Sequence, residues 1–155
     1  MGFFDKEKQI VDLEKKEAFI TFFCKGQEYA VPTSIVSEIT GLKALMPLPD
    51  KSGLIAGVME HKGLPYTVED MSARLLGEKA ELTETSCVIF VKDSNGVKSG
   101  CLADRPGDII KIDETLCKER VMDSFRLFHI GSRNILIPDI GMFYINKKDC
   151  CEPEL

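Results

Sequence analysis

Short apolar segments separated by turn residues dominate the pattern of the chain. The segment "AFITFFC" (residues 18–24) is apolar on both faces and rich in β-formers, and it continues as "EYAVP" after a break at Lys25-Gly26-Gln27. A similar arrangement recurs at "CVIFV" (residues 87–91), where "DSNG" supplies the turn before "VKSGCLAD". The pattern therefore predicts one β-hairpin near the start of each half of the chain.

A second pair of apolar segments predicts two further hairpins. "LIAGVMEH" turns at Lys62-Gly63 into "LPYTV", and "SFRLFHI" turns at residues 131–133 into "NILIPDI". The turns of the two halves recur at a spacing of 70 positions, which relates Gly26 to Gly96 and Gly63 to Arg133. A period this long indicates an internal duplication with two similar subdomains.

Two short helical segments are expected between the strands. We expect Thr67 to cap a helix, with Asp70 completing a capping box and Gly77 ending the helix after an apolar face of Val68, Met71 and Leu75. "PTSIVSEI" predicts one more helical turn, with an apolar side formed by Ile35, Val36 and Ile39. Short, apolar strands at this spacing favour small closed barrels, because closure removes exposed strand edges.

Composition and charge narrow the class of protein. The 155 residues suit one compact domain or two small subdomains that share a core. A net charge of −5 argues against nucleic-acid binding, which needs a surplus of Lys and Arg. The absence of a signal peptide or a long apolar run predicts a cytoplasmic protein without membrane insertion. We expect a charged N-terminal arm (residues 1–17), a folded region (18–146) and a C-terminal tail (147–155).

Residues with catalytic or metal-binding potential do not form a recognisable site. Three of the cysteines lie in apolar segments, where a thiol usually acts as a small buried hydrophobe: Cys24, Cys87 and Cys101. His61 and His129 fall at similar places in the two halves, but a zinc site needs three or four protein ligands, and strand-end histidines are the better interpretation. Nothing places the carboxylates of Glu60 and Asp70 face to face. The sequence predicts no enzyme activity, metal or cofactor.

Five segments, taken in order, resemble the CheW-type chemotaxis coupling proteins. They are "QEYAVPTSIVSEITGL", "MPLP", "GLIAGVMEHKG", "SGCLADRPGDIIKI" and "NILIPDIGMF", and the resemblance extends over residues 18–144. It implies a mainly β fold of two five-stranded SH3-like barrels around a shared core, with short helices. It also implies a scaffold that joins the cytoplasmic tip of chemoreceptors to the regulatory domain of the chemotaxis histidine kinase, peripheral to membrane-bound receptor arrays.

The resemblance assigns two sets of contact residues. The surface for the kinase regulatory domain would include Val36, Glu38, Leu45, Lys62 and Gly63. The groove for the receptor tip would include Gly57, Gly100 and Ile109.

Several positions depart from the usual family pattern. The family usually writes the "GVMEHKG" turn with an asparagine and an arginine, where this chain has Glu60 and Lys62. Lysine keeps the charge but loses the planar fork that binds bidentately. Ser72 stands where an arginine is common, and Pro106 and Gly107 replace an apolar pair. We therefore expect a divergent coupling protein whose Lys62 faces a partner, with His61 as a bystander or contact residue. The alternative is a CheW-like binding module of another two-component signalling system.

Overall fold

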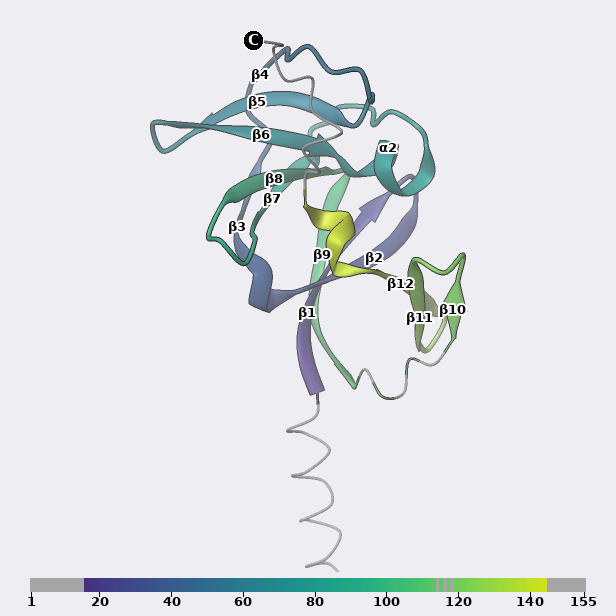
Figure 1. The fold of residues 1–155 in the computed structure, drawn as a ribbon. Helices are drawn as coiled ribbons and strands as arrows, with labels where there is room; N and C mark the ends of the chain where they lie inside the picture. The colour runs from purple at the N-terminus through teal and green to yellow at the C-terminus, as the bar shows by residue number, and fades with distance from the viewer. Residues whose placement is uncertain (1–15, 114, 116, 118, 145–155) are drawn as a thin grey trace, which may run out of the picture.

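The chain forms two six-stranded β-sheets that pack against each other (Figure 1). The computed structural model describes residues 16–144 except 114, 116 and 118. The strands are β1 (Lys16–Cys24), β2 (Gln27–Pro32), β3 (Val36–Gly41), β4 (Leu45–Met46), β5 (Ile55–His61), β6 (Leu64–Asp70), β7 (Cys87–Lys92), β8 (Lys98–Ala103), β9 (Arg105–Asp113), β10 (Arg120–Val121), β11 (Phe125–Ile130) and β12 (Arg133–Pro138). The helical segments are η1 (Thr33–Ile35), α2 (Met71–Leu76) and η3 (Ile140–Phe143). The predicted C-terminal tail and most of the predicted N-terminal arm lie outside the described residues, although β1 begins inside the arm.

The strand order of the two sheets reveals the internal duplication. Sheet A has the order β10-β11-β12-β2-β1-β9, and sheet B, read from its other edge, has the order β4-β5-β6-β8-β7-β3. Each strand of one sheet thus has a counterpart from the other half of the chain. Sheet A combines the first hairpin of the first half with the later strands of the second half, and sheet B does the reverse. The two halves are therefore intertwined, and neither half forms a sheet from its own strands alone.

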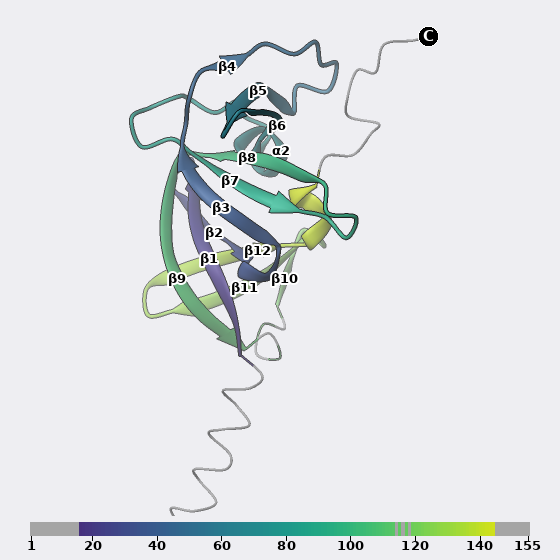
Figure 2. The same cartoon turned by 90° about the vertical axis from the view of Figure 1, so that its left-hand side faces the viewer.

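Sheet B curls into a small barrel. Lys43, which follows β3, donates its backbone N–H to Sδ of Met59 on β5 (3.4 Å). In the sheet order, β7, β8 and β6 lie between these two strands (Figure 2). The contact is possible only because the sheet bends round and brings its first strand back toward β5. The barrel encloses a core that comprises Met59, Val68, Val88, Phe90 and Leu102. Each sheet has five strands of six or more residues and a two-residue strand, β4 or β10, at one edge.

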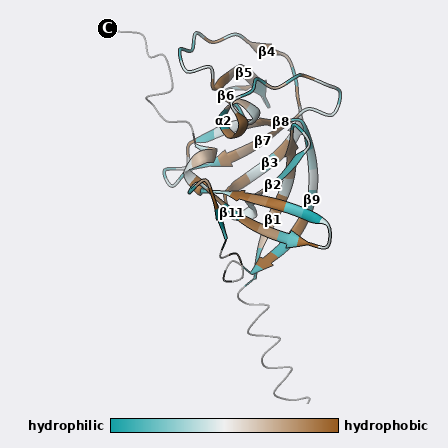
Figure 3. Ribbon diagram, turned by 90° about the vertical axis from the view of Figure 1, so that its right-hand side faces the viewer, coloured by the Kyte–Doolittle hydropathy of each residue, from teal (hydrophilic) through white to brown (hydrophobic). Residues whose placement is uncertain are grey.

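A shared core joins the two sheets. The largest buried cluster takes Phe22 and Tyr29 from sheet A and Ile89 and Val91 from sheet B. Hydrophobic colour follows the strands that meet there (Figure 3). The cluster also holds the three cysteines predicted to be buried, and burial raises the pKa of the thiols of Cys24, Cys87 and Cys101 to about 12, 11 and 12 respectively. These thiols are neutral at physiological pH, and they pack as small hydrophobic side chains.

The hairpin turns agree with the sequence in position but not always in type. Lys25-Gly26 and Lys62-Gly63 are two-residue turns in which both residues have positive φ, from 50° to 82°, as type I′ geometry requires. The "DSNG" hairpin instead closes through five residues, because Asp93 Oδ1 accepts the N–H groups of both Asn95 and Val97 (2.9 Å each). In the last hairpin, Arg133 opens β12 and does not belong to the turn.

Two helix predictions were wrong in their details. Asp70 is the N-cap of α2 and accepts the N–H of Ala73 (3.1 Å), while Thr67 remains in β6. The strand therefore continues three residues beyond the predicted cap, because β6 pairs with β8 up to Asp70. Gly77 ends α2 with φ of 72°, as predicted. "PTSIVSEI" forms only the 3-10 turn η1, and Val36 begins strand β3 because it pairs with Val91. Within the described ranges, no helix has the length and apolar character needed to span a bilayer.

Candidate functional site

Three side chains converge at the end of sheet B around the carboxylate of Glu38 on β3. One oxygen of Glu38 lies 2.9 Å from Nζ of Lys98 and 3.0 Å from Nε2 of His61, and the other lies 3.3 Å from Nζ of Lys62. Lys98 begins β8, His61 ends β5, and Lys62 is the first residue of the β5–β6 turn. We call Glu38, His61, Lys62 and Lys98 the Glu38 cluster.

The basic neighbours keep Glu38 ionised. Lys98, then His61 and Lys62, lower the pKa of this carboxyl from 4.5 to about 2. The Glu38 side chain is 27% exposed and that of Lys62 is 73% exposed, so the cluster reaches the surface. Its two lysines outnumber its one carboxylate, so the four residues together carry a net positive charge.

His61, which we expected to be a bystander or a contact residue, is buried and packs into the barrel wall. Its ring is 6% exposed and stacks on Phe90 at 5.0 Å, next to Glu38. The burial of His61 follows from the alternation of the strand, because Gly57, Met59 and His61 of β5 all face inward. A histidine that follows two inward positions at a spacing of two is expected to be buried.

Lys98 is the member of the cluster that the sequence did not reveal. It lies 60 positions from Glu38, and no local pattern relates the two residues. Its ammonium group also lies over the rings of Phe90 (4.8 Å) and Tyr66 (5.1 Å). β3 and β8 are the two neighbours of β7, so the pairing order of sheet B brings Lys98 and Glu38 together across Phe90.

The other residues assigned to the kinase surface lie at different depths. Gly63 is exposed beside Lys62 in the turn. Val36 begins β3 and packs half-buried against the shared core. Leu45 lies on β4, where it pairs with Met59 and packs on the barrel interior. Of the five residues, the structure brings only Glu38 and Lys62 into direct side-chain contact.

The residues assigned to the receptor groove separate into two kinds. Gly57 and Gly100 are buried, and a Cβ atom would lie 2.5 Å from the Met46 carbonyl oxygen at Gly57 and 2.7 Å from a Val88 methyl carbon at Gly100. Both glycines allow close packing of the strands and present no side chain. Ile109 is 69% exposed on β9, an edge strand of sheet A. Ile109 is thus the only one of the three that offers an apolar side chain to a partner.

Sheet A carries a second charged cluster around Arg133. Arg133 binds Glu28 bidentately, with Nε 3.0 Å and Nη2 2.6 Å from the two carboxylate oxygens, and Nη2 also lies 2.8 Å from Asp108. Thr21 donates its hydroxyl to Asp108 (3.0 Å) and accepts the backbone N–H of the same residue (2.9 Å). We call Glu28, Asp108, Arg133 and Thr21 the Arg133 cluster. Its guanidinium lowers the pKa of both carboxyl groups.

The residues tested for metal or acid–base chemistry lie apart. His129 is in sheet A, where its Nδ1 is 2.6 Å from the side-chain oxygen of Asn134, whereas His61 is in sheet B. Glu60 is exposed on β5, and Asp70 caps α2. Across the described part of the chain, no three metal-ligating side chains gather into a group that could hold an ion.

Comparison with known proteins identifies the family. A family model described as the CheW-like domain matches residues 18–138. The chain is 25% identical over 104 residues to the chemotaxis protein CheW of Bacillus subtilis (strain 168), a match that covers 67% of this chain and 66% of the relative. It is 32% identical over 95 residues to the chemotaxis protein CheW of Rhizobium meliloti (strain 1021), with 61% of each protein covered. The chain thus matches slightly less than two thirds of the length of these relatives.

The fold has a counterpart among solved structures. The crystal structure of the scaffolding protein TtCheW from Thermoanaerobacter tengcongensis superimposes with a TM-score of 0.72 at 20% identity, covering 86% of this chain and 97% of that one. This agreement confirms the predicted fold of two SH3-like subdomains. Because the family model covers most of the sequence, the chain belongs to the CheW-like domain family.

Proposed function

We propose that this protein is a non-catalytic scaffold that couples chemoreceptors to the chemotaxis histidine kinase through protein–protein contacts. Family membership and the resemblance to CheW proteins support this role. The observation that carries the proposal is the meeting of Glu38 and Lys62, two residues assigned to the kinase surface, 3.3 Å apart at the exposed end of sheet B.

The Glu38 cluster suits recognition of a protein surface with exposed acidic groups. Lys62 is held in a tight turn, and its ammonium group is positioned by Glu38. A charged side chain that is already held in place loses less conformational entropy on binding. Charged groups at the rim of an interface increase the association rate and exclude partners of the wrong charge. We assign this end of sheet B to the kinase regulatory domain.

Ile109 supports a separate contact with the receptor tip. It is 69% exposed on an edge strand, and an exposed β-branched residue suits the apolar face of a docked helix. Ile109 belongs to sheet A and the Glu38 cluster belongs to sheet B. The two proposed contacts can therefore be disrupted separately.

The kinase contact is tested with Lys62→Glu and a matched control. We expect this variant to bind the purified kinase regulatory domain roughly tenfold more weakly in calorimetric titration, because it reverses a positioned rim charge. Lys25→Glu is the control, since Lys25 is exposed and occupies the same position of the other type I′ turn. Equal affinity of both variants and the unmodified protein would contradict the assignment.

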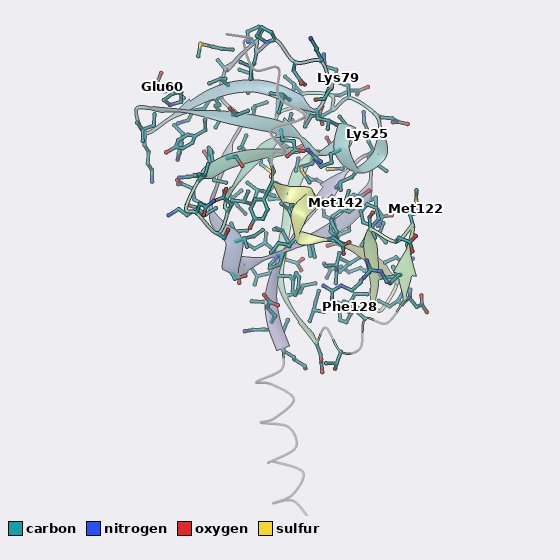
Figure 4. All side chains as sticks on the ribbon, viewed as in Figure 1. Lys25, Glu60, Lys79, Met122, Phe128 and Met142 are labelled. Carbon is teal, nitrogen blue, oxygen red and sulfur yellow. The ribbon has the colours of Figure 1, made fainter. Side chains whose placement is uncertain are left out.

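The receptor contact is tested with Ile109→Arg. A charged residue in an apolar contact is expected to abolish co-sedimentation with assembled receptor tips while leaving the melting temperature unchanged. Met122→Arg is the control, because Met122 is 84% exposed and follows β10, at the opposite edge of sheet A from β9 (Figure 4). Normal receptor binding by Ile109→Arg would refute the groove assignment. Failure of the unmodified protein to bind both receptor and kinase would favour a role in another two-component system.

A further inference from the structure

Strands β6 and β8 leave an open seam in sheet B. They form a parallel ladder only where Val68–Asp70 face residues 100–102. The preceding residues, 64–67 of β6 and 98–99 of β8, are paired with β5 and β7 but not with each other. Figure 1 shows the two strands close together near α2 and diverging toward the β5–β6 turn. A pocket of about 460 Å³ fills this opening, within the size range of ligand sites.

Backbone groups of β6 point into the seam. In a two-residue hairpin the residues that flank the turn, here His61 and Leu64, form a hydrogen-bonded pair, and bonded and non-bonded pairs then alternate. The backbone groups of Pro65 and Thr67 consequently point away from β5, toward β8. The carbonyl of Pro65 and the N–H of Thr67 remain available there, and both residues line the pocket. Free groups of this kind are the template for strand addition.

The equivalent seam of sheet A is closed. There the parallel ladder between β12 and β2 includes the pair Ile135↔Glu28. The corresponding residues of sheet B are Tyr66 and Lys98, which are not paired. Gln27 also donates its side-chain amide to the carbonyl of Asn134 (2.9 Å). Val97 occupies the place of Gln27 in sheet B, is 61% exposed and has no polar side-chain atom. The opening between β6 and β8 is therefore specific to sheet B.

The residues that line the seam determine which side chains a bound segment could carry. Lys98 supplies an ammonium group; Glu38 accepts one of its three N–H donors (2.9 Å), and the others remain for an occupant. Tyr66, Val97 and Tyr144 supply apolar surface. Asp93 also lines the pocket, but its Oδ1 is engaged by two N–H groups of its own loop. An extended backbone with one acidic and one apolar side chain matches these walls.

We propose that the β6–β8 seam binds a short extended segment of a partner protein, which pairs through its backbone with Pro65 and Thr67 and directs an acidic side chain to Lys98. This mode of binding differs from the helix docking and rim contacts of the proposed coupling role. It is tested without receptor or kinase, so its failure leaves that role intact.

The test uses the peptide Thr-Val-Glu-Val-Thr-Val-amide, labelled with fluorescein at its N-terminus, and fluorescence anisotropy. We expect saturable binding below 1 mM, with changes in the amide NMR signals of Thr67 and Ser99. The same peptide with lysine in place of glutamate should bind at least fivefold more weakly, because Lys98 would then face a like charge. A peptide with proline at both valines that flank the glutamate should not bind, because it lacks the backbone donors.

Two variants separate seam binding from adhesion elsewhere. Val97→Gln installs the sheet A residue, which we expect to bridge to the Pro65 carbonyl and weaken binding at least fivefold. Thr67→Pro removes one seam-facing N–H from a position that does not bond to β5, and it should weaken binding similarly while circular dichroism stays unchanged. If Thr67→Pro unfolds, Val97→Gln decides alone. Absence of binding at 1 mM, or equal binding by Val97→Gln and the unmodified protein, would overturn the proposal.

Discussion

The two barrels carry charged clusters at equivalent positions, with opposite arrangements of charge. Glu38 of sheet B corresponds to Asp108 of sheet A, and Lys98 corresponds to Glu28, each 70 positions apart. The second hairpins are offset by 69 positions, not 70, because His61 pairs with Leu64 as Ile130 pairs with Arg133. Arg133 therefore corresponds to Leu64, and not to Gly63 as the sequence spacing suggested. Sheet B surrounds a carboxylate with basic groups, and sheet A places a guanidinium between two carboxylates.

This difference separates a cluster that ties strands together from one that lies on the surface we propose for the kinase. Arg133 ties the β11–β12 hairpin to β2 through a planar bidentate contact with Glu28, whose side chain is 7% exposed. In sheet B, Leu64 is 57% exposed and takes no part in a comparable tie to Lys98. The β5–β6 hairpin consequently projects beyond the barrel (Figure 1). The same fold position ties one barrel together and, on the other, belongs to the surface that we propose for the kinase.

The largest expected effect comes from replacing Arg133, the cation at the centre of the Arg133 cluster. Arg133→Ala leaves the buried carboxylate of Glu28 without its partner, and we expect a loss of about 2–3 kcal/mol of unfolding free energy in urea titration. This is below the value for a fully buried pair because Arg133 is 36% exposed. Lys62→Ala, which shortens a 73% exposed side chain, should change stability by about 0.5 kcal/mol or less. Equal losses would show that both clusters have the same role.

A smaller effect tests the packing difference between the sheets. Gly100 of sheet B corresponds to Ala30 of sheet A, which is fully buried. Gly100→Ala adds a methyl group 2.7 Å from a Val88 methyl carbon and 3.1 Å from one of Val68, so we expect a loss of about 1–2 kcal/mol. Ala30→Gly is the reciprocal change, and it should also destabilise the protein because it leaves a small void. Thermal unfolding of both variants measures the effect, and an unchanged melting temperature for Gly100→Ala would contradict the close packing of β6, β7 and β8.

The smallest effect is the acid dependence of the Glu38 cluster. The pKa of Glu38 is lowered from 4.5 to about 2, so its ion pairs stabilise the folded state above pH 4.5 and are lost as pH falls toward 2. Glu38→Gln should therefore be less stable than the unmodified protein at pH 7, and the difference should shrink between pH 4.5 and 2. Glu60→Gln, which removes an exposed carboxylate of β5 that is not part of the cluster, is the control. A difference that stays constant over this range would contradict the assigned pKa.

Much of the fold follows from local pattern. The apolar segments, the turns at Lys25-Gly26 and Lys62-Gly63, and the burial of the cysteines depend on alternation and on backbone preference, which neighbouring residues determine. The helix at Thr67 was misplaced because a capping pattern cannot reveal that β8 extends β6 to Asp70. Pairing with a strand distant in the sequence thus outweighed the local capping preference.

The sequence alone determined that this chain makes paired hairpins around a β-rich core, and its ordered segments identified the family. The tertiary structure alone decided that the hairpins are exchanged between the two sheets and that Lys98 reaches Glu38. It also decided that the β6–β8 seam stays open while its counterpart in sheet A is closed. The physical reason is that these contacts join strands tens of residues apart. They exist only after the distant strands have paired into the two sheets, whereas alternation and turn geometry are set within a few residues.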